Sequence, residues 1–156
     1  MVRNMILILL AVAVGAAAPG AVAHDTQAVP PVPGPVIRPF EPPDHEYGPG
    51  HRGVDLQAEP GEPVRAALPG QVHFSGVVAG TGWVSIDHGG GLRTTYGDLD
   101  PRQVSGGAQV QAGTVIGNLA DEASHLDWGA LVDGAYIDPM TLLGEWEVRL
   151  VAPQGG

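Results

Sequence analysis

The sequence predicts an all-β domain, a compact antiparallel β-sheet structure with one short helical turn near its C-terminal end. Two observations favour this class. Apolar runs of strand length follow one another at a spacing of about ten residues, which is typical of antiparallel hairpins. Turn sequences that contain glycine separate these runs, and they account for much of the content of 24 glycines.

The expected strands lie between residues 64 and 137. They cover residues 64–68, 71–78, 83–87, 92–99, 108–110, 115–117, 125–132 and 135–137. Only residues 138–143 favour a helix. There, Asp138 suits the N-cap, Pro139 the first turn and Gly144 the end of the helix.

Residues 1–23 are typical of a secretory signal peptide. Arg3 precedes an apolar run over residues 5–18, and residues 21–23 give the small-x-small pattern of a cleavage site. An uncleaved membrane anchor is the alternative, but the run is shorter than the ~20 residues that span a bilayer. Cleavage before His24 predicts a secreted, extracytoplasmic product with no remaining membrane span.

Residues 24–49 are expected to form a proline-rich linker or lead-in. Residues 30–49 hold 8 of the 15 prolines of the chain. Because proline fixes φ and lacks an N–H, this segment favours extended, partly polyproline II backbone over a helix or a central strand. The last residues, 148–156, are expected to be a tail.

The composition excludes several kinds of chemistry. The chain has no cysteine and no lysine, so it cannot form disulfides or thiolate metal sites, and it has no lysine for phosphate binding or for attachment of lipoyl or biotinyl groups. The formal net charge of −10 argues against nucleic acid and anionic lipid as partners.

Two pairs of residues could bind a metal ion. His51 and Asp55 lie four apart around Gly53, and His125 and Asp127 lie two apart, so each pair shares one face of an extended chain. Imidazole and carboxylate are both zinc ligands. Either pair alone also fits a strand with a polar face in solvent. His88, beside a glycine turn, is expected to make a structural hydrogen bond.

A series of short motifs places these pairs in a wider pattern. They are, in chain order, residues 50–56 (GHRGVDL), 61–67 (GEPVRAA), 70–72 (GQV), 84–89 (VSIDHG), 92–96 (LRTTY), 113–117 (GTVIG), 125–129 (HLDWG) and 136–139 (YIDP). The series resembles the LytM/lysostaphin-type zinc metallopeptidases, which cut peptides of bacterial cell walls. The resemblance implies a LytM-like domain over residues 36–147, with an open groove.

The resemblance implies metal ligands at His51, Asp55 and Asp127, and catalytic positions at His125 and Asp98. Two of these five positions depart from the family pattern. The family has histidine where this chain has Asp127, in an H-x-H motif, and again where it has Asp98, two residues after a tyrosine.

The departures change the chemistry that the resemblance implies. Carboxylate is an accepted zinc ligand, but two carboxylates make a coordinated water less acidic and move the preference toward Ca²⁺ or Mn²⁺. An ionised Asp98 would repel a developing oxyanion. We expect an exported LytM-like metallopeptidase-family protein, a metal-dependent endopeptidase for bacterial cell-wall peptides. The expected metal is zinc, and the alternatives are another divalent ion or no metal. The alternative is an inactive relative that binds wall peptide or regulates a partner wall hydrolase.

Overall fold

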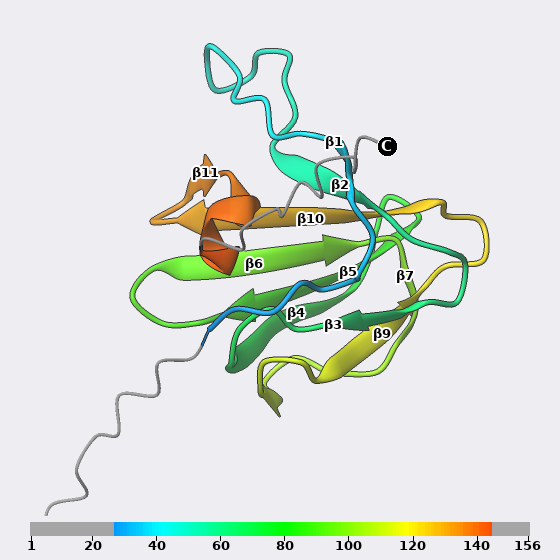
Figure 1. Cartoon of the computed structure of the whole chain (residues 1–156). Coiled ribbons are helices and arrows are strands. Elements are labelled where there is room, and N and C mark those ends of the chain that lie inside the picture. Colours follow the sequence, from blue (N-terminus) through cyan, green and yellow to red (C-terminus); the bar gives the residue numbers. More distant parts are fainter. Residues whose placement is uncertain (1–26, 145–156) are drawn as a thin grey trace, which may run out of the picture.

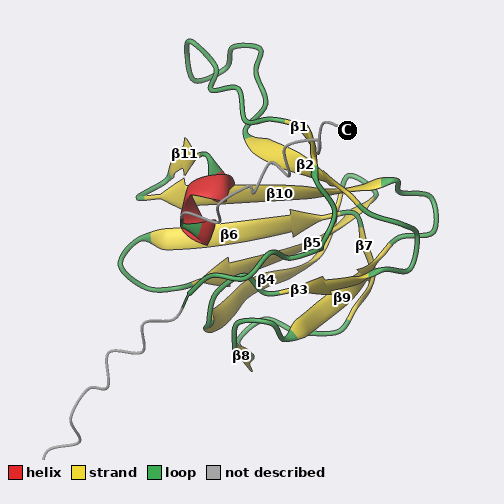
Figure 2. Ribbon diagram, viewed as in Figure 1, coloured by secondary structure: helices red, strands yellow, loops and turns green. Residues whose placement is uncertain are grey.

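The computed structural model describes residues 27–144, which form two antiparallel β-sheets packed against each other (Figures 1 and 2). The strands of the larger sheet are β1 (Val36–Arg38), β2 (Gly53–Gln57), β4 (Gly70–Val78), β5 (Thr81–Asp87), β6 (Leu92–Gly97), β8 (Gln109–Val110), β10 (His125–Val132) and β11 (Ala135–Ile137). The strands of the smaller sheet are β3 (Pro63–Arg65), β7 (Leu99–Arg102) and β9 (Val115–Leu119). The predicted all-β class is confirmed.

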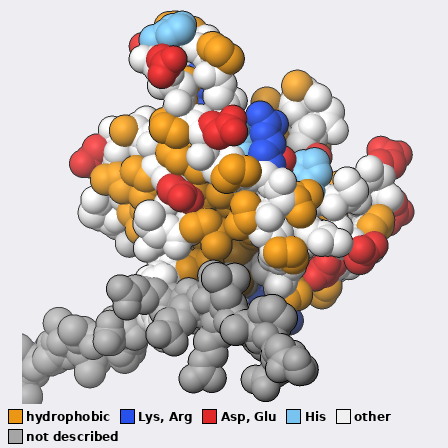
Figure 3. Space-filling view, turned by 45° about the horizontal axis from the view of Figure 1, so that its top comes forward, with side chains coloured by type: hydrophobic (Ala, Val, Ile, Leu, Met, Phe, Trp, Pro, Cys, Tyr) orange, Lys and Arg blue, Asp and Glu red, His pale blue; other side chains and the backbone are white. Residues whose placement is uncertain are grey.

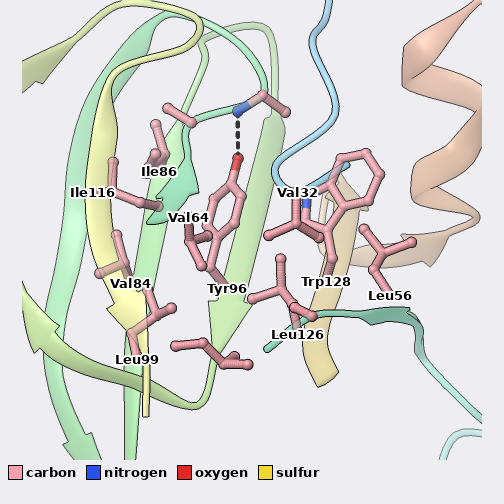
Figure 4. Close-up of a cluster of buried hydrophobic side chains, with 14 of the residues drawn as sticks. Val32, Leu56, Val64, Val84, Ile86, Tyr96, Leu99, Ile116, Leu126 and Trp128 are labelled. Carbon is pink, nitrogen blue, oxygen red and sulfur yellow. Dashed lines mark hydrogen bonds between the residues drawn. The ribbon is translucent and has the colours of Figure 1, made fainter. Parts of the chain in front are cut away.

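The larger sheet has the order β1-β2-β10-β6-β5-β4-β8, with β11 paired to β10, and the smaller sheet has the order β3-β9-β7. The core lies between them (Figure 4). Trp128 on β10 and Tyr96 on β6 are cross-strand partners and are fully buried in this core. Side chains alternate between the two faces of a strand. Asp127 of β10 therefore faces away from the core.

The predicted strand over residues 92–99 is divided in the structure. Asp98 has a φ of 63° and separates β6 from β7, which belong to different sheets. The chain then stays extended through Asp100 and Pro101 in β7. The run of residues that favours a strand therefore crosses a corner of the fold at Asp98.

Within the proline-rich segment, residues 36–38 form a strand, whereas residues 31–34 and 44–50 bend or turn. The segment is built into the domain. Its Ala28 and Val32 side chains are buried in the core, and β1 pairs with β2 at an edge of the larger sheet. The carbonyls of Pro31 and Pro35 accept hydrogen bonds from backbone N–H groups in β3 and β2. Proline cannot donate to a neighbouring strand but can still accept. Proline content therefore did not distinguish a packed edge segment from a free linker.

The predicted helical turn is a 3₁₀ helix, η1 (Pro139–Leu143). The Asp138 side chain accepts a hydrogen bond of 3.0 Å from the backbone N–H of Met140, as expected of an N-cap. The predicted signal peptide and the predicted tail lie outside the described residues. Within residues 27–144, no helix has the length and apolar character needed to span a membrane.

His88 belongs to a chain of hydrogen bonds that enters the core. Its Nδ1 lies 2.8 Å from the Pro69 carbonyl and its Nε2 lies 2.8 Å from the Thr94 hydroxyl. The Thr94 hydroxyl bonds the Tyr96 hydroxyl at 3.0 Å, and Tyr96 accepts from the backbone N–H of Ala67 at 2.9 Å. Because a carbonyl only accepts, Nδ1 donates to Pro69, and a neutral imidazole accepts at Nε2. The structural role expected of His88 agrees with these contacts.

The stability of the domain should fall as the pH drops through the range below 6.5. Burial lowers the pKa of His88 from its ordinary value, against smaller opposing effects of the Pro69 carbonyl and Asp87. Below pH 6.5, the His88 imidazole therefore binds a proton more readily in the unfolded chain than in the folded chain. The contribution of neutral His88 to the free energy of unfolding is complete above pH 6.5 and is lost as the pH falls below it. Urea unfolding between pH 5 and 8 should show a shallower pH dependence for His88→Gln. His73→Gln, at an exposed site on β4, is the control. Equal pH profiles in the wild type and His88→Gln would contradict this prediction.

Candidate metal centre

Two neighbouring strands place a pair of carboxylates opposite each other. β2 and β10 run antiparallel, and Asp55 is the direct partner of Asp127 in their register. Opposing residues of an antiparallel pair project on the same face. Gly53 on β2 leaves no room for a side chain, because a Cβ there would lie 2.6 Å from the Trp128 carbonyl oxygen and 3.1 Å from Asp127 Oδ1. The glycine in the middle of the H-x-G-x-D sequence is therefore a packing requirement of this strand pair.

His51 completes the cluster from just before β2. It forms a backbone bridge with Glu41, with N–H···O distances of 2.8 and 2.9 Å. Its Nε2 lies 3.0 Å from Asp55 Oδ1, and one ligand atom each of His51, Asp55 and Asp127 lies within 4.8 Å of the others. The structure thus brings together the three residues that the sequence predicts as metal ligands.

A proline carbonyl fixes the orientation of the His51 ring. His51 Nδ1 lies 2.9 Å from the Pro39 carbonyl oxygen, at the start of the long loop between β1 and β2 (Figure 1). Since a carbonyl only accepts, Nδ1 carries the proton and Nε2 is left with a free lone pair on the side of Asp55. Metal-binding histidines are commonly held in this way through their second nitrogen.

The electrostatics of the cluster favour a cation. Burial raises the pKa of Asp127, and the nearby carboxylates of Asp55 and Asp98 raise it further, against the opposing effects of His51 and His125. His51 and Asp55 are both about 9% exposed. Two carboxylates with little solvent and only imidazole partners repel each other, and a divalent cation between them would offset that repulsion. The donor set therefore fits a metal ion.

His125 lies at the edge of the cluster. It precedes Asp127 by two residues on β10, so both project on the same face. His125 Nε2 is 3.8 Å from Asp55 Oδ2, and the His125 side chain is 37% exposed. This imidazole is therefore close to the carboxylates and also accessible to a ligand.

Asp98 is not among the three residues whose ligand atoms lie within 4.8 Å of one another. It lines a hollow of about 350 Å³, together with Gly82, Arg102 and Glu122 among others. Its backbone turns the chain between the two sheets, and its charge contributes to the raised pKa of Asp127. Asp98 is thus close enough to affect the cluster electrostatically, but it does not join the group of candidate ligands.

That groove has a volume of about 430 Å³ and includes His51 and Asp127 in its lining. The remaining lining residues come mainly from β2, β4, β5, β6 and β10: Arg52, Gly53, Phe74, Val78, Trp83, Val84, Ser85, Thr95, Gly129 and Tyr136. The aromatic residues Trp83, Trp128 and Tyr96 each suit either a groove wall or the core by their residue type. In the structure Trp83 lines the groove, whereas the other two fill the core.

Comparison with known proteins agrees with this arrangement. The model of peptidase family M23 matches residues 49–139. The chain belongs to peptidase family M23. This result confirms the resemblance to LytM/lysostaphin-type peptidases that the sequence motifs indicate.

Relatives of this M23 chain include proteins of two other bacteria. It is 45% identical to the uncharacterized protein Rv2891 of Mycobacterium tuberculosis over 125 residues, which cover 74% of this chain and 50% of the relative. It is 33% identical to the DD-carboxypeptidase/endopeptidase Mpg of Neisseria gonorrhoeae over 97 residues, which cover 59% of this chain and 22% of that protein. The chain spans half of the first relative's length and less of the second.

Solved structures of two M23-type proteins have a similar fold. Helicobacter pylori Csd3 superimposes with a TM-score of 0.65 and 27% identity, over 73% of this chain and 34% of Csd3. The catalytic domain of lysostaphin from Staphylococcus simulans gives a TM-score of 0.57 and 26% identity, over 67% of this chain and 88% of the lysostaphin domain.

In the absence of metal, Asp127→Asn should raise the free energy of unfolding at pH 7. The pKa of Asp127 is raised in the folded state, so the stability that its protonated form gives at low pH is lost as the pH rises and the buried carboxylate ionises. Removing that charge also removes its repulsion with Asp55. Urea unfolding with EDTA tests this, with Asp121→Asn, at an exposed position, as the control. A loss of stability in Asp127→Asn under these conditions would show that the carboxylate is stabilising without metal.

Proposed function

We propose that this M23 domain is a metal-dependent endopeptidase that acts on bacterial cell-wall peptides outside the cytoplasm. The observation that supports this proposal most directly is the cluster of His51, Asp55 and Asp127, with His125 beside it, at an open groove that His51 and Asp127 line. Active peptidases need both a polarising centre and room for an extended peptide beside it. The name of the Neisseria relative, a DD-carboxypeptidase/endopeptidase, agrees with an endopeptidase activity.

His51, Asp55 and Asp127 would hold the metal ion, for which zinc is the first choice from the family. When bound, it would supply Lewis acidity toward the scissile carbonyl and toward water. The Pro39 carbonyl keeps Nε2 of His51 available as a ligand atom. The single histidine and two carboxylates also suit harder divalent ions such as Mn²⁺ or Ca²⁺.

His125 would hold or move the proton of the reaction. Its Nε2 lies 3.8 Å from Asp55 Oδ2 and its side chain is 37% exposed, so it is accessible to a ligand held at the carboxylate cluster. His125 would thus act as a general base toward water or donate to the developing oxyanion.

Catalysis is not the only use that this groove supports. Asp98 stands where the family pattern has a histidine. A carboxylate in that position does not supply the N–H donor that a histidine would offer to an oxyanion. This observation favours, as the second candidate, a domain that binds wall peptides without turnover or regulates a partner wall hydrolase.

Export of the protein is part of the proposal. It rests on the apolar run over residues 5–18 and on the small residues at 21–23, which together are typical of a secretory signal peptide. A protein that acts on the cell wall must be exported, which requires such a signal. Mass spectrometry of the protein from culture fractions would test this point, because cleavage should leave His24 as the first residue.

Purified protein with Zn²⁺ should cleave fragments of bacterial cell-wall peptides. His51→Ala should abolish cleavage and zinc binding together, because it removes a proposed ligand. His125→Ala should keep the metal and lose about 10²- to 10⁴-fold in rate, the usual effect of a general base. Cleavage is measured by mass spectrometry and zinc binding by calorimetry. The matched control is His73→Ala, an exposed histidine on β4.

Two results would contradict the proposal that the protein is an endopeptidase. Unchanged cleavage in His51→Ala would show that another group or a contaminant is responsible. Absence of cleavage by the wild type, with activity gained in the double variant Asp98→His/Asp127→His, would favour the second candidate. In that case the native groove binds peptide and the two aspartates are the reason for its inactivity.

A further inference from the structure

The groove beside the metal centre carries a positive charge that the proposed chemistry does not use. Arg52 follows His51 directly in the chain, and both residues line the groove. Among the described lining residues, Arg52 is the only lysine or arginine. In a protein with a formal charge of −10, this guanidinium is a local exception. Figure 3 agrees with that balance: on the face it shows, acidic side chains are more frequent than basic ones.

The guanidinium is held in place but is not neutralised. Arg52 Nη2 donates to the backbone carbonyl of Glu46 in the loop between β1 and β2, at 2.6 Å. It forms no ion pair with a carboxylate among residues 27–144. An arginine has five N–H donors in a planar fork, so one bond to a carbonyl leaves donors free for a ligand. Arginine is also the side chain best suited to bind a carboxylate through two parallel hydrogen bonds.

The other residues that line the groove indicate which kind of ligand would carry this carboxylate. Phe74, Val78 and Tyr136 give it apolar walls, and all three side chains are substantially exposed. Ser85 and Thr95 are cross-strand partners that also line it, and their hydroxyls can bond a peptide backbone. Small apolar residues in an extended peptide fit these walls, and one acidic group of the peptide would lie opposite Arg52.

We propose that Arg52 is a specificity residue, and that the groove selects peptides of small apolar residues that carry a free carboxylate near the metal centre. This inference rests on the proposed function, because it narrows the substrate class of the same groove. A neutral or basic peptide of equal size would lack the charge-assisted hydrogen bonds. The surrounding acidic surface would also disfavour a second carboxylate elsewhere on the ligand.

The test compares acidic peptides with their uncharged amides. The first probes are acetylated, amidated tetra-alanines in which Glu or Gln replaces each position in turn. A second pair, acetyl-tetra-alanine with a free or an amidated C-terminus, distinguishes a terminal carboxylate from a side-chain one. Dissociation constants for the full chain are measured by calorimetry with and without Zn²⁺, and the same samples are checked for cleavage by mass spectrometry.

The wild type should bind at least one acidic peptide roughly tenfold more tightly than its amide, a difference of about 1.4 kcal/mol. This ratio should fall to about one in Arg52→Gln and be restored in part by Arg52→Lys. Arg65→Gln is the matched control, because Arg65, which is exposed where Arg52 is half-buried, also donates to a single carbonyl, that of Gly113, but does not line the groove. Its ratio should stay at the wild-type value.

Three outcomes would overturn the inference. They are equal binding of every acid and amide pair by the wild type, an unchanged ratio in Arg52→Gln, and absence of binding by any peptide at millimolar concentration. If Arg52 only anchors the loop through Glu46, Arg52→Gln would weaken all peptides alike and leave the ratio unchanged. If the wild type prefers the acidic peptides but cleaves none of them, the result would support the role of Arg52 and count against the proposed endopeptidase. If it cleaves peptides without preferring the acidic ones, the result would support the endopeptidase and count against the role of Arg52.

Discussion

The site depends on the register between β2 and β10. Because side chains alternate along a strand, a shift of one residue would turn Asp55 toward the core and bring the neighbouring apolar residues to the groove. In the observed register, Trp128 is buried on one face while Asp127 meets Asp55 on the other. The same pairing that closes the core therefore assembles the ligand atoms. Substitutions that loosen the core near Trp128 are for this reason expected to affect the metal centre as well.

The arrangement concentrates negative charge where a stable sheet would avoid it. Two carboxylates opposite each other on neighbouring strands repel, and burial makes their ionisation still less favourable. Nothing else in the two-sheet architecture requires acidic residues there. The hydrogen-bond chain from His88 through Tyr96 differs from this arrangement, because each of its polar groups contacts a hydrogen-bond partner. Unfavourable charge concentrated at one point of a fold is a usual mark of a functional site.

Much of the fold and part of the site could be predicted from the sequence. Short apolar runs between glycine turns gave the β class, because the period of hairpins is a local property of the chain. The order of the motifs carried the resemblance to the LytM/lysostaphin-type peptidases, and that resemblance implied His51, Asp55 and Asp127 as candidate ligands. The walls of the groove could not be found in this way. Phe74, Val78 and Tyr136 are distant in sequence, and only the pairing of the strands shows that they line one groove.

The position of Asp98 was also beyond the sequence. Its place in the family pattern suggested a residue beside the metal, but its side chain direction depends on a left-handed backbone at a corner between the two sheets. The proline-rich segment was misjudged for a related reason. Its composition is that of a linker, whereas its carbonyls and two small side chains find partners only in the folded domain.

That segment also ties the candidate metal centre to the part of the domain that precedes β2. The Pro39 carbonyl that orients His51, and the prolines that bond β2 and β3, come before their partners in the chain. A variant that lacked residues 27–39 would keep every strand from β2 onward, but His51 would lose the carbonyl that fixes its ring. The proline-rich segment is in this sense part of the site, although none of the three candidate ligands comes from it.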